Sequence, residues 1–175
     1  MNFINVEIKA RCDDPDRIRA ILKSHHAKFH GNDHQIDTYF QCAMGRLKLR
    51  EGDIENYLIH YEREDRSGPK QSAVTLYQPQ PDSSLKQILA KALGILVVVD
   101  KQREIYFIDN VKFHIDMVKG LGSFIEIEAI DLTGEIGVER LRQQCNFYRE
   151  LLGIHPDALI ARSYSDLLRE SRQSA

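Results

Sequence analysis

The first stretch of the chain, residues 2–11, alternates apolar and polar side chains without a break. Successive side chains of a β-strand point to opposite faces, so this pattern predicts a strand with one apolar and one charged face. The apolar face carries Ile4, Val6, Ile8 and Ala10, and the polar face carries Asn5, Glu7, Lys9 and Arg11. A polar face of mixed sign fits either the solvated side of an open sheet or the inside of a barrel that holds a metal and an anion.

Similar patterns predict a series of further strands separated by short turns. They cover residues 35–40, 46–50, 56–63, 72–78, 95–101, 103–108, 111–118 and 123–131. The turns are predicted at residues 45, 52–53, 109–110 and 119–122. Because the strands come in runs with short connections, we expect antiparallel hairpins and an α+β fold rather than a parallel βαβ sheet.

Helical spacing of apolar residues predicts helices between these runs of strands. The first helix begins at Pro15, after the N-cap residue Asp14, and continues to about His26. The other predicted helices extend from a cap at Asp82 or Ser83 to Gly94, from Gly137 to Leu152, and over a short helix or turn at 157–160.

The C-terminal segment 163–168 fits either a short helix or a final strand. The last residues, 171–175, are short and polar and predict a frayed, disordered tail. We therefore expect a single domain over residues 1–170.

Composition and charge narrow the class of function. Of the 175 residues, 42% are hydrophobic and 29% are charged, as in ordinary globular domains. The net charge of -2 argues against a large, uniformly basic nucleic-acid surface. No secretory signal is evident, the longest apolar run (95–99) is too short to span a bilayer, and the cysteines form no Cys-x-x-Cys pair. We expect a cytoplasmic protein with reduced thiols that binds neither nucleic acid nor a membrane.

The polar faces of the predicted strands repeatedly place like charges in a row. These rows are Arg46/Lys48/Arg50, Lys101/Arg103 and Glu126/Glu128. Neighbouring positions on one face lie only about 7 Å apart, so such charges repel unless a group of opposite sign lies between them. If the strands close into a barrel, the rows face one another across a cavity and the apolar faces pack outward against the helices. Cations suited to phosphate and carboxylates suited to a hard metal then point to a metal–polyphosphate complex.

Several segments of the chain together resemble a known family. Residues 5–11 (Asn-Val-Glu-Ile-Lys-Ala-Arg) resemble an opening Glu-x-Glu-x-Lys signature, and residues 114–128 resemble a pattern near the C-terminal strands of class IV adenylate cyclases. Further matches are the basic segments 46–50 and 99–103, the triplet 61–63 and the ending 163–168. The family is the CYTH superfamily, which also includes thiamine triphosphatases and tripolyphosphatases. The resemblance covers nearly the whole chain and implies an eight-stranded antiparallel β-barrel, the triphosphate tunnel, with helices packed on its outside.

The resemblance implies roles for the matched side chains. Triphosphate oxygens would be held by Lys9, Arg46, Lys48, Arg50, Arg63, Lys101 and Arg103. A divalent metal, Mg²⁺ or Mn²⁺, would be bound by Glu7, Glu126 and Glu128. The catalytic residues would be Glu7, Lys9, Lys101 and Asp116, with Asp116 as a further ligand or an orienting group.

At two positions the family roles cannot be assigned directly to this chain. His114 fits a core or hydrogen-bonding histidine at least as well as an acid or base. Asn5 stands where the signature has its first glutamate, and a neutral amide oxygen binds Mg²⁺ more weakly than a carboxylate. If that glutamate supports a second metal, this chain would hold only one tightly.

The resemblance implies a metal-dependent enzyme that acts on a triphosphate, and two chemistries share such a site. A class IV cyclase-like reaction converts ATP to cyclic AMP and pyrophosphate, and the chain length and segment 114–122 favour it. A hydrolase cleaves thiamine triphosphate, inorganic tripolyphosphate or a nucleoside triphosphate. The change at Asn5 motivates a third hypothesis, a module that binds a polyphosphate or nucleotide without turnover. The resemblance leaves the oligomeric state open between a monomer and a homodimer, because members of the family often pair up but no stretch of the sequence predicts an interface.

Overall fold

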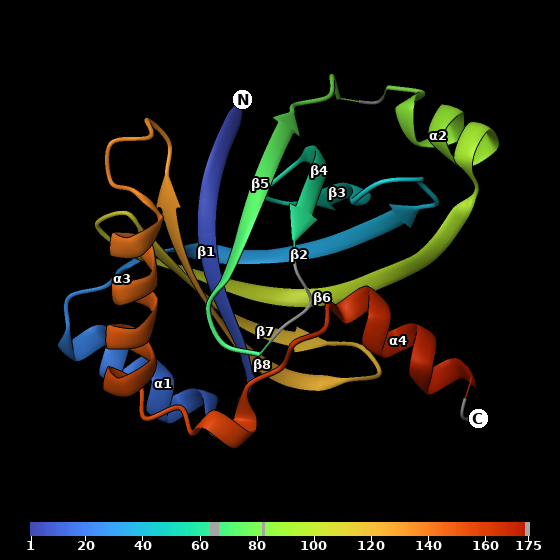
Figure 1. Cartoon of the computed structure of the whole chain (residues 1–175). Helices are drawn as coiled ribbons and strands as arrows, with labels where there is room; N and C mark the ends of the chain where they lie inside the picture. Colours follow the sequence, from blue (N-terminus) through green and yellow to red (C-terminus); the bar gives the residue numbers. More distant parts are fainter. Residues whose placement is uncertain (64–66, 82, 174–175) are drawn as a thin grey trace.

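Within residues 1–63, 67–81 and 83–173, which the structure describes, eight antiparallel strands close into a barrel (Figure 1). In this computed structural model the strands are β1 (Asn2–Arg11), β2 (Lys28–Phe40), β3 (Arg46–Gly52), β4 (Tyr57–Arg63), β5 (Lys70–Tyr77), β6 (Ile95–Ile108), β7 (Val111–Val118) and β8 (Gly122–Asp131). Their order around the barrel is β1-β5-β4-β3-β2-β6-β7-β8. The predicted α+β class and the antiparallel barrel are confirmed.

The helices lie outside the barrel, where the outward faces of the strands are apolar (Figure 1). They are α1 (Pro15–Ser24), α2 (Leu85–Leu93), α3 (Val138–Leu151), the short 3₁₀ helix η1 (Pro156–Ala158) and α4 (Tyr164–Gln173). As predicted, Asp14 caps α1, and its carboxylate accepts a hydrogen bond from the backbone N–H of Arg17 at 3.0 Å. No helix in the described part of the chain is long and apolar enough to cross a membrane.

The outward face of β1 forms the centre of the main core. Val6, Ile8 and Ala10 are at most 1% exposed and pack in one cluster with Leu22 of α1 and Leu141 of α3. Full burial of an aliphatic side chain of this kind contributes about 1.5–3 kcal/mol. Because this face is fixed against the helices, the alternate side chains of β1 point into the barrel.

Strands β2 and β6 are longer than the sequence pattern indicated. β2 begins at Lys28 rather than at Gln35, and Ile95–Ile108 is one continuous strand where the pattern indicated two. The two strands pair with each other along this length, with a shift of register next to Gly31. Pairing between the two strands therefore sets their length. The sequence pattern underestimated it because polar residues and the shift of register interrupt the alternation of apolar and polar side chains.

The C-terminal segment forms the helix α4 and not a final strand. Ser163 and Asp166 cap it reciprocally: the Asp166 backbone N–H donates to Ser163 Oγ at 3.2 Å, and the Ser163 backbone N–H donates to the Asp166 carboxylate at 3.1 Å. The helix continues to Gln173, so it includes the first residues of the predicted tail 171–175. Residues 174–175 lie outside the described ranges. α4 packs beside β6 at one end of the barrel (Figure 1).

The helix α2 begins slightly later than predicted. Its N-cap residue is Ser84 rather than Ser83, and Asp82, the other predicted cap, lies outside the described residues. The helix ends at Gly94, whose φ of 77° lies in the left-handed region that favours glycine. The predicted stop of this helix is therefore confirmed.

Candidate active site

The inward faces of the strands enclose a charged cavity of about 520 Å³, which we call the tunnel. Nine of the eleven side chains predicted for the site lie on its wall: Glu7, Lys9, Lys48, Arg50, Arg63, Lys101, Arg103, Glu126 and Glu128. They come from β1, β3, β4, β6 and β8, which are far apart in the sequence. The polar faces therefore converge on one enclosed site. The side chains that were predicted to bind a ligand lie close enough together to contact the same ligand.

Arg46 and Asp116 do not line the tunnel. Arg46 lies in an adjoining cavity, and its Nη2 is 3.0 Å from Oδ2 of Asp166 in α4. Asp116 lies behind Arg103, whose Nε and Nη2 donate to its two carboxylate oxygens at 2.7 and 2.5 Å. It also accepts a hydrogen bond from the hydroxyl of Tyr164 at 2.8 Å. Asp116 therefore orients Arg103, and this contact fits the predicted orienting role better than a role as a metal ligand.

Asp37 of β2, which the sequence reading did not assign to the site, holds three cations together. Its carboxylate accepts hydrogen bonds from Lys48 (2.9 Å), from Arg50 (2.8 and 3.0 Å) and from Lys101 (2.7 Å). Burial by itself raises the pKa of Asp37, but Arg50 and the two lysines outweigh this effect and hold the pKa well below its usual value. Asp37 is thus a fixed counter-ion inside the tunnel wall.

Glu55 is a second residue of the site that the sequence reading missed. It follows β3, in the connection to β4, where the pattern indicated only a turn. Its carboxylate reaches into the tunnel and accepts hydrogen bonds from Arg50 at 2.8 Å and from Lys112 of β7. The backbone N–H groups of Ile54 and Glu55 donate to the carboxylate of Asp33 at 2.9 and 3.1 Å, which fixes this connection. The turn therefore supplies a fixed anion to the site.

The opposite wall carries the glutamates predicted to bind metal. Glu126 accepts hydrogen bonds from Arg103 at 2.7 Å and from His114 Nδ1 at 3.1 Å, and its other oxygen lies 3.0 Å from Lys9 Nζ. Glu7 accepts a hydrogen bond from Arg63. Burial raises the pKa of Glu126, but Lys9 and Arg103 outweigh it and hold the pKa well below its usual value. The carboxylate of Glu126 is therefore ionised at neutral pH.

The donors of this wall fit a hard divalent cation in chemical type. Glu7 and Glu128 face each other across the β1–β8 pair, and Glu126 lies two residues before Glu128. The Nδ2 group of Asn5 donates to Glu128, while its Oδ1 is buried without a hydrogen-bond partner in the described part of the chain. Buried oxygens of this kind are ligands for Mg²⁺ or Mn²⁺. Among the described residues no three acidic, His or Cys side chains already converge on one point, so the carboxylates would have to turn toward a cation.

Two buried bases have altered proton affinity. Burial lowers the pKa of Lys101 to about 7, although Asp37 opposes this change. At pH 7 Lys101 is therefore partly neutral, and a bound polyanion favours its charged form. Burial lowers the pKa of His114 to about 4, with Arg103 and Lys112 acting in the same direction. Since its imidazole is neutral at pH 7, His114 serves as a hydrogen-bonding partner of Glu126.

The start of α4 and the chain segment before it are anchored to the site by side chains that the sequence reading did not assign. The ring of Tyr164 lies 3.8 Å from Lys9 Nζ, while the hydroxyl of Tyr164 binds Asp116. Lys70 of β5, which is fully buried, donates to the backbone oxygens of Ile160 and Ala161 at 2.8 and 3.1 Å. The C-terminal segment is thus held at the same end of the barrel as Lys9.

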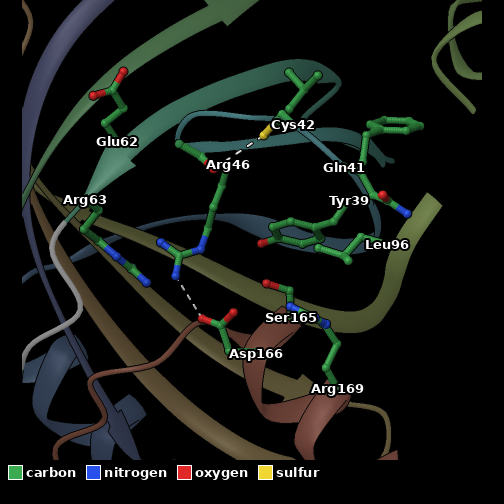
Figure 2. A pocket seen from close by; sticks show the side chains of 13 residues that line it. Tyr39, Gln41, Cys42, Arg46, Glu62, Arg63, Leu96, Ser165, Asp166 and Arg169 are labelled. Carbon is green, nitrogen blue, oxygen red and sulfur yellow. Dashed lines mark hydrogen bonds and ion pairs between the residues drawn. The ribbon is translucent and has the colours of Figure 1, made fainter. Parts of the chain in front are cut away.

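The two ends of the tunnel differ in chemistry. At the end where β1 begins, which we call the apolar end, most of the wall is formed by Phe3, Leu76, Phe107, Ile130, Leu132 and Ile136, and Asp109, Asn110 and Thr133 add polar groups. At the end where β1 finishes, which we call the basic end, Arg46, Arg63 and Arg169 surround a second cavity of about 840 Å³ (Figure 2). Tyr39 and Arg63 line both cavities, so the tunnel adjoins the second cavity at the basic end.

Comparison with known proteins places this barrel in a family. The CYTH domain matches residues 4–164. A Methanocaldococcus jannaschii protein named "Putative adenylate cyclase MJ0240" is 28% identical to this chain over an alignment 180 residues long, gaps included. The alignment covers 94% of this chain and 98% of that protein.

Solved structures share the fold. PH1012 from Pyrococcus horikoshii OT3 has a TM-score of 0.71 at 23% identity, over 93% of this chain and 98% of that one. HpAC1 from Hippeastrum, for which a dominant triphosphatase activity is reported, has a TM-score of 0.61 at 14% identity, over 95% and 96% of the two chains. Because the family match spans most of the barrel and its charged tunnel, the chain belongs to the CYTH domain family.

Proposed function

We propose that the tunnel is the active site of a divalent-metal-dependent enzyme that converts an organic triphosphate, with ATP as substrate and cyclic AMP and pyrophosphate as products. The observation that carries this proposal is the composition of the tunnel wall, where cationic side chains and carboxylates face one another inside a closed barrel. A compact polyanion together with a divalent cation gives a partner to each sign of charge in that wall.

The phosphate chain binds among cations that are already ordered. Lys48, Arg50 and Lys101 converge on Asp37, and their side chains are 12%, 9% and 1% exposed. Because water reaches them so little, their interaction with a phosphate is screened weakly. A substrate gains these charge-assisted hydrogen bonds without first ordering the side chains, which is the preorganisation that favours catalysis.

Glu7, Glu126 and Glu128, with the amide oxygen of Asn5, are the groups that would hold Mg²⁺ or Mn²⁺. When bound, such a metal neutralises phosphate oxygens and makes the attacked phosphorus more electrophilic. The neutral amide at Asn5 lowers the total negative charge of this ligand set. We therefore propose that the site holds one divalent cation more tightly than a second.

The cyclase reaction needs the ribose and the phosphates in one extended arrangement. The 3′-hydroxyl oxygen of ATP attacks the α-phosphorus while the bond from that phosphorus to the α–β bridging oxygen breaks. Pyrophosphate leaves with the bridging oxygen, and the hydroxyl proton passes to solvent. Lys9 and Lys101 offset the charge that builds up on the leaving phosphates, and Asp116 holds Arg103 in place for the same purpose.

The apolar end supports an organic substrate. Phe3, Leu76 and Ile130 offer carbon surface there, and Asn110 and Thr133 add polar groups to the same part of the wall. A nucleobase or another flat ring gains about 25 cal/mol for each Å² of apolar surface that it buries against them. Inorganic tripolyphosphate has no group that can use this end.

A triphosphate hydrolase is the second candidate function. The similarity to HpAC1, with its reported triphosphatase activity, favours this reaction. Water would attack the terminal phosphorus, the bond to the β–γ bridging oxygen would break, and orthophosphate would leave. The same cations and carboxylates serve both reactions, because both develop charge on phosphate oxygens.

One assay separates the candidate functions. Purified protein is incubated with Mg²⁺ or Mn²⁺ and, in turn, with ATP, thiamine triphosphate and inorganic tripolyphosphate. Cyclic AMP and pyrophosphate from ATP would support the cyclase, and orthophosphate release would identify a hydrolase. Saturable binding without any product would identify a binding module and contradict both enzymatic proposals.

A further inference from the structure

The cavity at the basic end is built by elements that meet only in the folded barrel. Its wall comes from the end of β2, the start of β3 and the connection between them, and from the end of β4, the start of β6 and the first turns of α4. In Figure 2, Arg46, Arg63 and Arg169 lie around its centre, with the hydroxyl end of Tyr39 and Asp166 beside them. The cavity has a volume of about 840 Å³, so it can hold a hydrated anion.

Cationic groups dominate the inner surface of this cavity. Asp166 is already engaged, because its carboxylate binds Arg46 at 3.0 Å and closes the cap of α4. Glu62 also borders the cavity, but in Figure 2 its carboxylate points away from the arginines. Arg169 has no ion pair with any residue in the described ranges and is available to an incoming anion.

We propose that this cavity is an exit site that receives the inorganic phosphate released in the tunnel. The proposal rests on the proposed function, in which the organic group of the substrate occupies the apolar end. The phosphate chain then extends toward the basic end. In the cyclase reaction pyrophosphate forms on that side, and in the hydrolase reaction orthophosphate does, so either product reaches the arginines without passing the organic group.

The side chains of the two cavities differ in burial, and this difference favours movement of the product from the tunnel to the exit site. In the tunnel, the side chains of Lys101 and Asp37 are 1% and 2% exposed, whereas those of Arg46 and Asp166 are 20% and 23% exposed. Partly solvated cations bind an anion more weakly than buried ones because water screens the interaction. A phosphate that moves from the tunnel to the exit site therefore goes from a strong site to a weaker one, from which it can dissociate.

The experiment measures whether pyrophosphate binds while the tunnel is occupied. Isothermal titration calorimetry is performed in EDTA, which prevents metal-dependent turnover. The protein first receives tripolyphosphate until the tunnel is saturated, and pyrophosphate or orthophosphate is then titrated into the complex. We expect weak, saturable binding of at least one of the two anions, and the two titrations show which product the exit site accepts.

Arg169→Gln tests the site directly, because this side chain does not line the tunnel. We expect the second binding event to weaken by roughly 3- to 5-fold, as for the loss of one partly solvated ion pair, while tripolyphosphate affinity is unchanged. Arg172→Gln, an exposed arginine of the same helix that borders neither cavity, is the matched control and should change neither affinity.

The outcomes distinguish the exit site from the proposed function. If saturating tripolyphosphate excludes both pyrophosphate and orthophosphate, or if Arg169→Gln binds them as the wild type does, the exit site is refuted and triphosphate binding in the tunnel stands. If tripolyphosphate binds neither in EDTA nor in the presence of Mg²⁺ or Mn²⁺, the proposed function fails, and the exit site fails with it.

Discussion

The apolar end and the basic end of the tunnel are formed by the same strands, yet they offer a substrate opposite chemistry. Near the start of β1 the inward positions carry Phe3 and, on β8, Ile130, whereas the next inward positions of these strands, Asn5 and Glu128, are polar. Beyond the charged middle, arginines surround the second cavity. Alternation in a strand therefore decides only which side chains point inward, and position along the tunnel axis decides what those side chains recognise.

This difference implies a direction for the bound substrate. An apolar wall gains from burying a ring and loses from burying a phosphate, and the reverse holds for a wall of cations. A triphosphate ester therefore has one favourable orientation, with its organic group at the apolar end. A comparison of ATP with inorganic tripolyphosphate, which lacks the organic group, therefore separates effects on the phosphate site from effects on the apolar end.

The largest effect is expected in the charged middle, from Glu126→Gln. The amide removes the negative charge that Lys9, Arg103 and His114 share, and it removes a proposed metal ligand. Turnover of ATP and of tripolyphosphate should fall by about 100-fold or more, because removing one preorganised electrostatic group from an active site costs about 2.7–4 kcal/mol of transition-state stabilisation. Steady-state kinetics measures the loss, circular dichroism checks the fold, and the exposed Glu139→Gln is the control. Near-normal turnover by a folded variant would exclude this carboxylate from the site.

Lys48→Ala removes one cation from the middle of the tunnel and should act on both ligands alike. Lys48 lies 2.9 Å from Asp37, which keeps its contacts with Arg50 and Lys101 in the variant. A lost charge-assisted contact of about 1.5–3 kcal/mol corresponds to roughly 10- to 100-fold weaker binding. Calorimetry in EDTA measures the affinity for tripolyphosphate and for ATP, with Lys23→Ala on α1 as the control. Unchanged affinity for both ligands would remove Lys48 from the phosphate site.

The sequence predicted some of the residues that line the tunnel and missed others. Alternation predicted that Lys48 and Glu126 share the inward side, because each strand has a period of two. It did not reveal Asp37 as the counter-ion of Lys48, since the register between β2 and β3 depends on the closed barrel and not on either strand alone. Glu55 was missed because it belongs to a turn without alternation, and its place depends on contacts with Asp33.

Arg46 is the opposite case, a residue that the sequence assigned to the site but that does not line the tunnel. It continues the row of Lys48 and Arg50, so the pattern placed it on the same face, and the family resemblance implied the same triphosphate-binding role. The structure instead turns its guanidinium toward Asp166, whose position depends on the cap of α4. A residue at the end of a strand is free to follow a distant partner, whereas residues in the middle are confined by strands on both sides.

The pH dependence of binding should identify Lys101 as a cation that becomes charged when phosphate binds. Burial lowers its pKa to about 7, while the groups around it are Asp37, Arg50, Arg103 and Lys48. Below pH 7 the free protein already carries the proton, and above pH 7 binding must recruit one. The dissociation constant for tripolyphosphate should therefore rise as pH rises through 7, by up to about tenfold per pH unit.

Lys101→Arg is the control for this pH series, because arginine stays charged over the whole range. Both proteins experience the same titration of the ligand, so the difference between their curves isolates Lys101. Parallel curves between pH 6 and pH 9 would contradict a role for Lys101 in proton uptake.

The apolar end should discriminate between the two ligands. Ile136 lines this end, follows β8 and is 36% exposed, so Ile136→Asn changes the wall with little effect on the core. The KM for ATP should rise by roughly 5-fold, because part of an apolar contact worth about 1.5 kcal/mol is lost. The KM for tripolyphosphate should not change. Ile88→Asn, at an exposed position of α2, is the matched control. An equal rise for both ligands would contradict the proposed orientation.

The smallest effect is expected from Tyr164→Phe, which separates the two contacts of this side chain near the basic end. The variant keeps the ring beside Lys9 and loses only the hydrogen bond to Asp116, which is still bound by two nitrogens of Arg103. The kcat should fall by about 2- to 5-fold, since one hydrogen bond contributes about 1 kcal/mol. Tyr164→Leu should also weaken tripolyphosphate binding, because it frees Lys9 as well. If both variants lower kcat equally and leave binding unchanged, the ring does not position Lys9, and the start of α4 acts on the site through Asp116 and Arg103 alone.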